Sequence, residues 1–404
     1  MTMAMGNYRR VLGLPGVRTL LLLTFASRIP AAATNMVLTL HVVLTLHRDY
    51  GSAGLVGAAG TIGIAIGAPL TGRLVDALGV RKMVTITTVI YATYWLTAWL
   101  LPYTGLLVAA FVSGVFAMPV MSIGRQALAA LVPTEHRRAA YSLDSISLEM
   151  TFMVGPALGV LIATKVSTTA AVISVGVMLV ASGIALFVVN PPVRGAHEPP
   201  SADAVRPPRR EWIRAPMLVG LITGCGAVFI LAGTEVTIVA ALRTTGEVGL
   251  TGVVIITMCI ASAVGGIVYG ALHRTPGPLM LMTLLGLLVV PVGLVGGQWW
   301  VLCLALIPTN LMCAPTLSST ADRISRVAPA AVRGEAMGLH SSALTLGGAL
   351  GSPIVGTVVD HWNAIGGFAA AGLGGVLIGA LALPFVRQRP VAVEPSEQVM
   401  AVSP

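Results

Sequence analysis

Twelve long apolar segments, separated by short polar stretches, restrict this chain to one broad class of fold. Crossing a bilayer core takes about 20 helical residues, and each segment has about that length or more. The segments lie near residues 17–46, 52–75, 83–101, 104–132, 138–164, 168–190, 214–243, 247–272, 277–297, 299–327, 334–360 and 363–387. Only 10% of the 404 residues are charged, whereas a soluble domain has about 25%. The sequence therefore predicts an all-α membrane protein with twelve transmembrane helices.

One long polar stretch, residues 191–213, divides the segments into six and six. It contains three Pro-Pro pairs and no apolar period, so we expect an irregular linker. The predicted organisation is a six-helix bundle over residues 1–190 and a second one over residues 214–390. A short tail follows over residues 391–404, and both linker and tail are expected in the cytoplasm.

The two halves repeat one another in sequence. A shift of 196 residues aligns four pairs of identical residues: Pro133 with Pro329, Arg137 with Arg333, Ala140 with Ala336, and Gly155 with Gly351. Parallel repeats of this kind are a transporter architecture, with the solute site between the halves near the bilayer midplane. We therefore expect two pseudo-symmetric bundles around a central site.

Positive charge is concentrated on one side of the predicted spans. The side that holds the N-terminus has nineteen basic residues: Arg9, Arg10, Arg18, Arg73, Arg81, Lys82, Arg137, Arg138, Arg194, Arg206, Arg209, Arg210, Arg214, Arg274, Arg323, Arg326, Arg333, Arg387 and Arg389. The other side has Arg48, Lys165 and Arg243. Because cytoplasmic loops carry the excess of Arg and Lys, both termini are predicted to be cytoplasmic, in a multi-pass protein of the cytoplasmic (inner) membrane. The net charge of +9 then follows from topology, and no nucleic-acid partner is expected.

A polar motif, Gly-Arg-Leu-Val-Asp-Ala-Leu-Gly-Val-Arg-Lys, occupies residues 72–82 after the second segment. We interpret it as a short loop that acts as a conformational latch. Its glycines permit close backbone approach, and Asp76 is suited to cap a helix N-terminus in the other half. Its basic residues are expected to join Asp76 in one network that favours the outward-open state. The residues of the predicted latch are Gly72, Arg73, Asp76, Gly79, Arg81 and Lys82.

Two further motifs complete a family resemblance. A partial second copy of the 72–82 motif (the eroded motif copy), Gly-Ala-Leu-His-Arg, occurs at residues 270–274 of the second half. The fifth segment carries Gly-Pro-Ala-Leu-Gly, of which the motif residues are Gly155, Pro156 and Gly159. With the six-plus-six layout, the chain resembles the major facilitator superfamily over essentially its whole length.

The resemblance extends in part to the drug and metabolite:proton antiporters of that superfamily, in which helix five carries such a Gly-Pro element. Thr151 and Val160 stand where the pattern has further glycines, and Ala110 stands where the helix-four pattern has an arginine. The resemblance implies the major facilitator fold and transport by alternating access.

Four charged residues lie deep within the spans of the first half, away from their ends, and each is a functional candidate because a charge at membrane depth is costly. Counting residues along each helix places Arg28 and Glu149 at one depth, and Arg125 and Asp144 at a shallower one. Depth alone therefore predicts the pairs Arg28–Glu149 and Arg125–Asp144. We hypothesise that Glu149 is the main proton carrier and Asp144 a second one. The alternative is that both are static ion pairs that join helices one, four and five.

The second half has fewer such candidates. Glu235 near the outer end of helix seven is either a solvated rim residue or a group for gating or cation capture. Asp322, Arg323 and His340 are expected at the cytoplasmic mouth, where a static network is the favoured interpretation. His41 could titrate near neutral pH, but a lone histidine near a helix end is more often an ordinary polar residue.

The expected cavity is largely apolar. Aromatic residues cluster in the third segment, at Tyr91, Tyr94, Trp95 and Trp99. Prolines in segments one, four and ten are expected to bend helices that line the cavity in this superfamily: Pro30, Pro119 and Pro315. A lipophilic solute, cationic or zwitterionic, fits such a cavity better than a sugar does.

We therefore predict a proton-driven exporter of a small, largely apolar drug or metabolite. The alternative is an importer or uniporter of a small metabolite, which accumulation of labelled solute in expressing cells would reveal. A non-transporting scaffold or receptor would need a filled cavity, and the buried charges argue against it.

No enzyme activity, cofactor or metal site is predicted. The sequence has no Walker motif and no nucleophile-elbow motif, and its four cysteines show no metal spacing. The expected partners are a small-molecule substrate, protons and the lipid bilayer, and the protein is expected to be a monomer.

Overall fold

The computed structural model describes residues 2–48, 50–193, 207–247, 250–272, 276–295 and 298–386, and these residues form helices joined by short connections. The α-helices are α1 (Thr2–Gly13), α2 (Val17–Leu40), α3 (Tyr50–Leu78), α4 (Val80–Thr97), α5 (Tyr103–Val115), α6 (Val120–Leu131), α7 (Arg137–Lys165), α8 (Thr168–Val189), α9 (Arg209–Trp212), α10 (Ala215–Thr244), α11 (Thr251–Ala271), α12 (Pro278–Val289), α13 (Trp299–Asn310), α14 (Cys313–Val327), α15 (Arg333–His361), α16 (Ala364–Ala380) and α17 (Leu383–Val386). The shorter helical pieces are η1 (His41–Thr45), η2 (Ala98–Leu100), η4 (Val290–Val295) and η5 (Ala330–Val332).

Twelve of these helical stretches are long and apolar enough to cross a membrane, which confirms the predicted fold class. The fourth span is interrupted between α5 and α6, where Pro119 immediately precedes α6. The tenth span is interrupted between α13 and α14, and Pro315 lies in the first turn of α14. Proline is tolerated at these positions because the first amides of a helix have no intrahelical acceptor. Pro30 lies inside the continuous helix α2, which ends in the π-helical turn η1.

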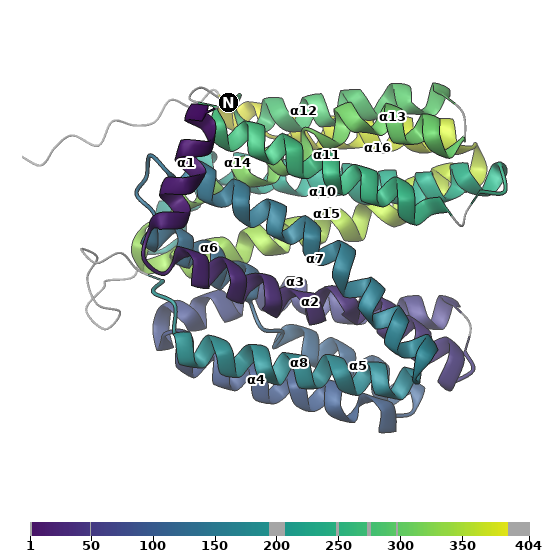
Figure 1. The fold of residues 1–404 in the computed structure, drawn as a ribbon, viewed down its shortest axis with the longest axis horizontal. Helices are drawn as coiled ribbons and strands as arrows, with labels where there is room; N and C mark the ends of the chain where they lie inside the picture. Colours follow the sequence, from purple (N-terminus) through teal and green to yellow (C-terminus); the bar gives the residue numbers. More distant parts are fainter. Residues whose placement is uncertain are drawn as a thin grey trace, which may run out of the picture.

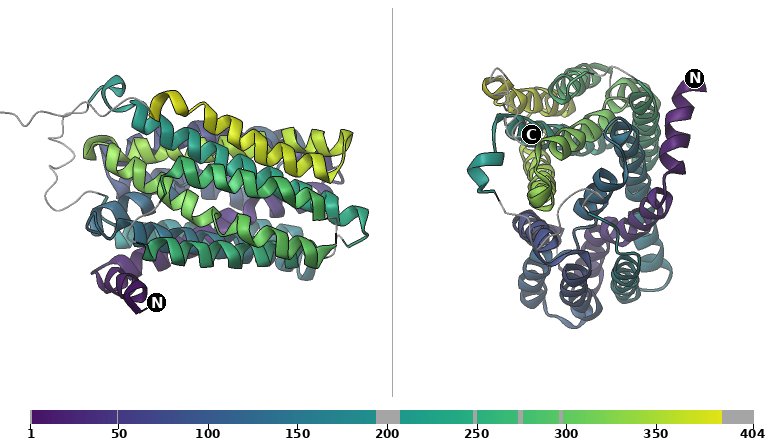
Figure 2. Two further views of the ribbon diagram at one scale, coloured as in Figure 1. Left: turned by 90° about the horizontal axis from the view of Figure 1, so that it is seen from above. Right: turned by 90° about the vertical axis from the view of Figure 1, so that its left-hand side faces the viewer.

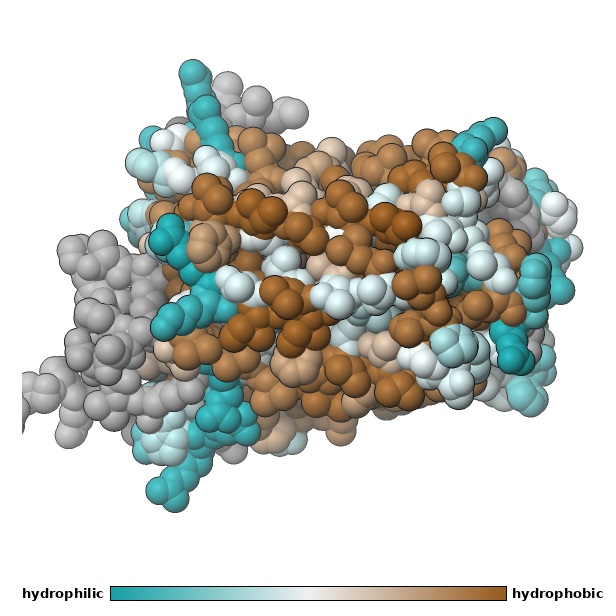
Figure 3. Space-filling view, turned by 90° about the horizontal axis from the view of Figure 1, so that it is seen from below, coloured by the Kyte–Doolittle hydropathy of each residue, from teal (hydrophilic) through white to brown (hydrophobic). Residues whose placement is uncertain are grey.

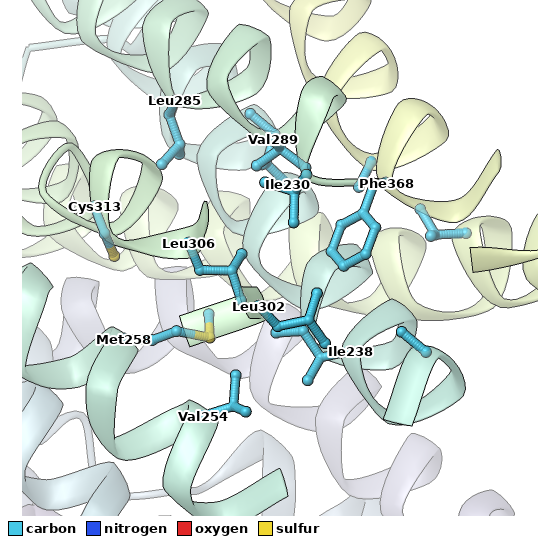
Figure 4. Packing of buried hydrophobic residues seen from close by; sticks show 14 of the residues in the cluster. Ile230, Ile238, Val254, Met258, Leu285, Val289, Leu302, Leu306, Cys313 and Phe368 are labelled. Atoms are coloured by element: carbon cyan, nitrogen blue, oxygen red, sulfur yellow. The ribbon is translucent and has the colours of Figure 1, made fainter. Parts of the chain in front are cut away.

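The two halves occupy different parts of the molecule (Figure 1), with α10 to α16 above most of the first-half spans. Each half has its own apolar core. In the second half, side chains from α10, α11, α12, α13 and α16 meet around Ile230, Leu302 and Phe368 (Figure 4). The repeat is visible in the helices as well, because Arg137 and Arg333 each begin a helix of 29 residues.

Apolar side chains cover the middle of the molecule and hydrophilic ones gather at both ends (Figure 3). The exposed apolar side chains include Leu22, Leu161 and Leu377, which are 69%, 53% and 68% exposed. A belt of this kind matches the hydrocarbon core of a bilayer.

The end of the bundle at which α2, α7, α10 and α15 begin is named the basic end below, because Arg137, Arg138, Arg209, Arg214 and Arg333 lie there. The helix α1 lies at this end, beside the spans and not among them (Figure 2). Predicted residues Arg194, Arg206, Arg274, Arg387 and Arg389, the tail 391–404 and part of the linker lie outside the described residues.

The aromatic cluster of the third span lies in the core of the first half. Tyr91, Tyr94 and Trp95 are at most 7% exposed, and both tyrosine rings meet the Trp95 ring edge-on, with centroids 6.5 and 5.5 Å away. The prediction that these rings line the cavity is therefore wrong for these three residues. On α4 they pack in the first-half core, where α4 contacts α8, α3 and α5, since a buried aromatic stripe packs equally well in a core.

Candidate functional site

Two helix pairs join the halves, and the first is α3 with α15. Gly72 faces the backbone of Gly334, and Gly338 faces the backbone of Ala68, so that a Cβ atom on any of these three glycines would overlap the partner helix. The Ser342 hydroxyl donates to the Ala65 carbonyl at 2.6 Å. Small residues thus bring the two backbones into direct contact.

Asp76 links these two helices at the basic end. Its carboxylate oxygens accept hydrogen bonds from the backbone N–H groups of Gly334 and Glu335, both at 2.9 Å, and the side chain is only 5% exposed. These amides are in the first turn of α15, where a helix has free donors and a partial positive charge. The carboxylate of one half therefore caps a helix of the other half.

The predicted loop is mostly helical, which corrects the interpretation of residues 72–82. Asp76 lies in the last turn of α3, and only Gly79 separates α3 from α4. Gly79 has φ of 80°, a backbone conformation that favours glycine. The helix extends up to this residue because Arg, Leu, Val, Asp and Ala at 73–77 all tolerate helical conformation.

The basic residues of the motif do not all join the latch. Glu335 accepts from Arg209 at 2.6 Å and from the half-exposed Arg73 at 3.5 Å. Arg81 instead donates to the Phe187 carbonyl at 3.2 Å within the first half, so its predicted place in the network is wrong, and Lys82 is exposed. Sequence reasoning missed Glu335, although an acid two residues after Arg333, the repeat partner of Arg137, was a usable signal for a charged first turn of a helix.

The second pair, α7 with α11, is related to the first by the repeat. Arg138 at the start of α7 donates to the Leu272 carbonyl just after α11, at 2.7 Å. Ser142 of α7 hydrogen bonds to the Gly266 carbonyl. Gly270, from the eroded motif copy, faces the Tyr8 hydroxyl first and Ser142 next, and a Cβ atom there would overlap Tyr8.

Tyr8 of α1 also bridges this pair, and sequence reasoning missed it. Its hydroxyl donates to the Ile267 carbonyl of α11 at 2.6 Å and lies 3.2 Å from the Ser142 hydroxyl of α7. Burial raises the pKa of Tyr8 above its usual value. The N-terminal helix thus straps the two halves together at the basic end.

Further inter-half contacts continue from the basic end to mid-height. Arg326 donates to the Thr134 carbonyl at 3.0 Å, and Ser145 meets Ser318 at 2.9 Å. The hydrogen bonds that join described residues of opposite halves all lie in this part of the bundle. The structure is therefore closed at the basic end.

A buried charge network lies just above this closure. Asp144 of α7 contacts Arg28 of α2 at 2.7 Å and Arg125 of α6 at 3.4 Å. All three side chains are at most 3% exposed. Two guanidinium groups therefore share one carboxylate, and the trio carries one net positive charge.

The Arg125–Asp144 contact is present, but the predicted Arg28–Glu149 pair is wrong. Asp144 and Glu149 are five residues apart on α7, which turns their side chains about 140° away from each other. Asp144 therefore points into the first half, whereas Glu149 points toward the second. Depth along a helix gave no information about this rotation.

Arg125 also reaches across to the second half. Its Nη1 lies 3.0 Å from Nδ1 of His340 on α15, and Nε2 of His340 lies 3.1 Å from the Thr320 hydroxyl of α14. The His340 side chain has no exposed surface. Sequence reasoning placed His340 at a mouth with Asp322 and Arg323, but it lies in the charge network of the first half.

Glu149 meets only neutral partners of the second half. Its Oε1 accepts from the Ser262 hydroxyl of α11 at 2.9 Å and from the Cys313 thiol of α14 at 3.4 Å. Within the described ranges, no basic side chain forms an ion pair with Glu149. Such a carboxylate can bind a proton without losing an ion pair, in contrast to Asp144.

Glu235 lies on α10, 20 residues from its start and so about 30 Å along the helix. The side chain is exposed, and it interacts electrostatically with Glu149. Glu235 lies nearer than Glu149 to the end opposite the basic end.

Two further predicted residues, Asp322 and Arg323, have structural contacts. Asp322 pairs with Arg326 one turn away at 2.9 Å, and Arg323 donates to the Pro216 carbonyl at 3.0 Å. His41 is buried in η1, and neither ring nitrogen has a hydrogen-bond partner among the described residues.

The glycines of the helix-five motif hold α7 against α2. Gly155 faces the Ile29 carbonyl, and Gly159 faces Ala33 and Val37. Pro156 lies inside the continuous helix α7. Over the described residues, no group of three or more His, Cys, Asp or Glu side chains is arranged to hold a metal ion.

Twelve spans in two repeated bundles, with buried charges where the bundles meet, define a membrane transporter of the two-repeat type. The family model of the Major Facilitator Superfamily matches residues 20–297 and 246–402. The chain belongs to this superfamily of transporters. A search of curated protein sequences found no match.

Solved structures with the same fold cover nearly the whole chain. The human organic anion transporter MFSD10 (TETRAN) has 18% identity and a TM-score of 0.67, covering 93% of this chain and 99% of that one. A variant of the Escherichia coli fucose:proton symporter FucP has 16% identity and a TM-score of 0.67, with coverage of 92% and 98%. A bacterial homologue of the iron transporter ferroportin in an outward-facing state has 14% identity and a TM-score of 0.73, with coverage of 93% and 100%. At these identities the likeness concerns the fold.

Proposed function

We propose that this protein exports a small, largely apolar drug or metabolite in exchange for protons, by alternating access. In this proposal the protein lies in the cytoplasmic membrane, and the basic end and both termini face the cytoplasm. The observation that carries the proposal is the placement of Glu149: a carboxyl group at mid-depth, between the halves, with neutral partners only.

The protonation of Glu149 couples the halves for a physical reason. Charged Glu149 is stabilised by donors of the second half, Ser262 and Cys313, and it interacts unfavourably with Glu235. A proton on Glu149 removes this repulsion and weakens the hydrogen bonds that hold α7 to α11 and α14. The proton therefore changes the relative free energies of the two arrangements of the halves, which is the requirement for coupled transport.

Asp144 has a different role in this proposal. Its protonation would leave Arg28 and Arg125 as buried cations without a counter-charge, which is strongly unfavourable. Asp144 therefore stays ionised and fixes helices α2, α6 and α7 of the first half as a rigid unit. This assigns the static role, and not a second carrier role, to Asp144.

The contacts at the basic end favour the outward-facing arrangement. Asp76 and Tyr8 from the first half bind backbone groups of the second half there. The substrate would enter a region whose ionisable groups are the acids Glu149 and Glu235, which supports a lipophilic cation over an anion as cargo.

The test is transport by purified protein in proteoliposomes with an imposed pH gradient. Glu149→Gln should abolish pH-driven movement of tetraphenylphosphonium, used as a lipophilic cation probe, and retain exchange of labelled for unlabelled probe. Glu211→Gln, an exposed acid on α9, is the matched control and should behave as wild type. Wild-type coupling in Glu149→Gln would overturn the assignment.

The direction of transport separates export from the import or uniport alternative. In cells that lack other exporters, expression should lower the accumulation of the probe, and a protonophore should restore it. Accumulation that rises with expression would favour import, and transport indifferent to the protonophore would favour uniport.

A further inference from the structure

The hydrogen bonds around His340 define its protonation state. An arginine side chain can only donate, so Nδ1 of His340 accepts the bond from Arg125 at 3.0 Å. The Thr320 hydroxyl donates its own hydrogen to the Leu317 carbonyl at 2.8 Å. That hydroxyl must therefore accept the hydrogen on Nε2 of His340 at 3.1 Å. Both constraints require the neutral imidazole with its proton on Nε2.

A second proton would occupy Nδ1, directly opposite the Arg125 guanidinium. Two donors and two positive charges would then meet at 3.0 Å, with no exposed surface at His340. Such a pair is strongly repulsive where water is excluded.

The surroundings offer no acid to compensate the imidazolium. Around His340, α14 presents Thr320, α10 presents Gly224 and α6 presents Arg125. Behind Arg125 lie Arg28 of α2 and Asp144 of α7. Asp144 is already shared by those two arginines, so it has no charge left to compensate a third cation. On α15 itself, the acid Glu335 is more than one turn away and is paired with Arg209.

A further group, Asp76 of α3, caps the first turn of α15 and does not reach the ring. Where α3 packs nearest to His340, it contributes the backbone of Ala68 against Gly338. Asp322 of α14 is paired with Arg326, and the described residues of α16 and η5 include no charged side chain.

We propose that His340 is a second proton-binding site of this transporter, whose occupancy controls closure at the basic end. Neutral His340 accepts from Arg125 and holds α15 of the second half against α6 of the first. Protonated His340 repels Arg125, so the halves separate from the basic end to mid-height. The inference rests on the proposed proton-driven exchange and adds the place at which the proton acts. The proton on His340 opens the basic end, and the proton leaves His340 once water reaches the ring.

The test measures the distance between the halves without any substrate. Spin labels on non-natural amino acids at Lys82 and Arg214, two exposed basic-end positions in opposite halves, leave the native cysteines unchanged. In lipid nanodiscs, the wild type should populate a longer distance on acidification from about pH 8 to about pH 5. We expect the ratio of open to closed molecules to rise at least about tenfold.

Three variants separate His340 from other titrating groups. His340→Gln keeps a neutral acceptor and should lose most of the opening on acidification, keeping only the part that comes from Glu149, whereas His340→Lys should be open at both pH values. His361→Gln makes the same change on an exposed histidine at the far end of α15 and should respond as wild type. A normal pH response of His340→Gln would overturn the proposal.

A measurement on the wild-type protein covers the case in which the variants do not fold. The ¹⁵N spectrum of histidine-labelled protein should contain, near neutral pH, a buried ring with Nε2 protonated and Nδ1 unprotonated, and a charged ring there would refute the tautomer argument. Loss of coupling in Glu149→Gln is a separate readout. Failure of Glu149 leaves the pH-dependent distance of His340 intact, and failure of His340 leaves the Glu149 coupling intact.

Discussion

The Asp76 cap predicts how strongly one carboxylate holds the basic end closed. Asp76→Asn keeps the size of the side chain but replaces one carboxylate oxygen by an NH₂ group. One of the two backbone donors, Gly334 N–H or Glu335 N–H, then faces another donor, and the other keeps only a neutral hydrogen bond. A charge-assisted bond contributes about 1.5–3 kcal/mol and a neutral one about 0.5–1.5 kcal/mol, and an unsatisfied buried donor costs about 1–3 kcal/mol.

These terms destabilise the closed arrangement by about 2–4 kcal/mol, since both groups are solvated when the halves separate. The ratio of closed to open molecules should fall roughly 30- to 900-fold. The Lys82–Arg214 label distance in nanodiscs measures this ratio. Asp360→Asn, an exposed acid near the other end of α15, is the control. A distance distribution equal to that of the control at both high and low pH would refute the reasoning, and so would wild-type transport rates.

Two further predictions follow from buried contacts. Asp144→Asn leaves Arg28 and Arg125 without a counter-charge and should lower the free energy of unfolding by about 3–5 kcal/mol. Glu149→Gln should lower it by less than about 1.5 kcal/mol. Denaturant titration in detergent compares the two variants, and equal losses would contradict the assigned roles. Tyr8→Phe removes the hydrogen bond to Ile267 and should raise hydrogen exchange in α1 about two- to tenfold. Burial raises the pKa of Tyr8 above 10.0. The docking of α1 through Tyr8 should therefore be complete below pH 10.0 and weaken as pH rises through the raised pKa. Hydrogen exchange in α1 that changes neither with Tyr8→Phe nor with pH would exclude the strap.

The two repeat-related helix pairs at the basic end, α3 with α15 and α7 with α11, are joined by side chains of opposite charge. In one pair an acid at the end of α3 caps the start of α15. In the other pair a base at the start of α7, Arg138, binds the carbonyl after α11. Both choices match the helix dipole, because a helix start favours an acid beside it and a helix end favours a base. Two bundles of one architecture thus close through complementary contacts.

The twelve spans and their repeat were readable from the chain because membrane insertion is a local requirement. Each span must satisfy its own backbone hydrogen bonds and bury about 20 apolar residues, so length and hydropathy alone locate it. The repeat pairs Arg137 with Arg333 and Gly155 with Gly351 are identities at positions that begin or pack equivalent helices. The cost of a charge in lipid likewise marked Arg28, Arg125, Asp144 and Glu149 as candidates.

The partners of those charges were not readable from the chain. Which way a side chain points depends on the rotation and tilt of its helix, and these follow from packing against helices that are distant in sequence. Asp144 therefore binds Arg28 and Arg125, Glu149 binds Ser262 and Cys313, and Arg125 meets His340. Hydropathy fixes where each helix crosses the membrane, but only the contact of two bundles fixes what each buried group touches, because that contact is made between residues far apart in the chain.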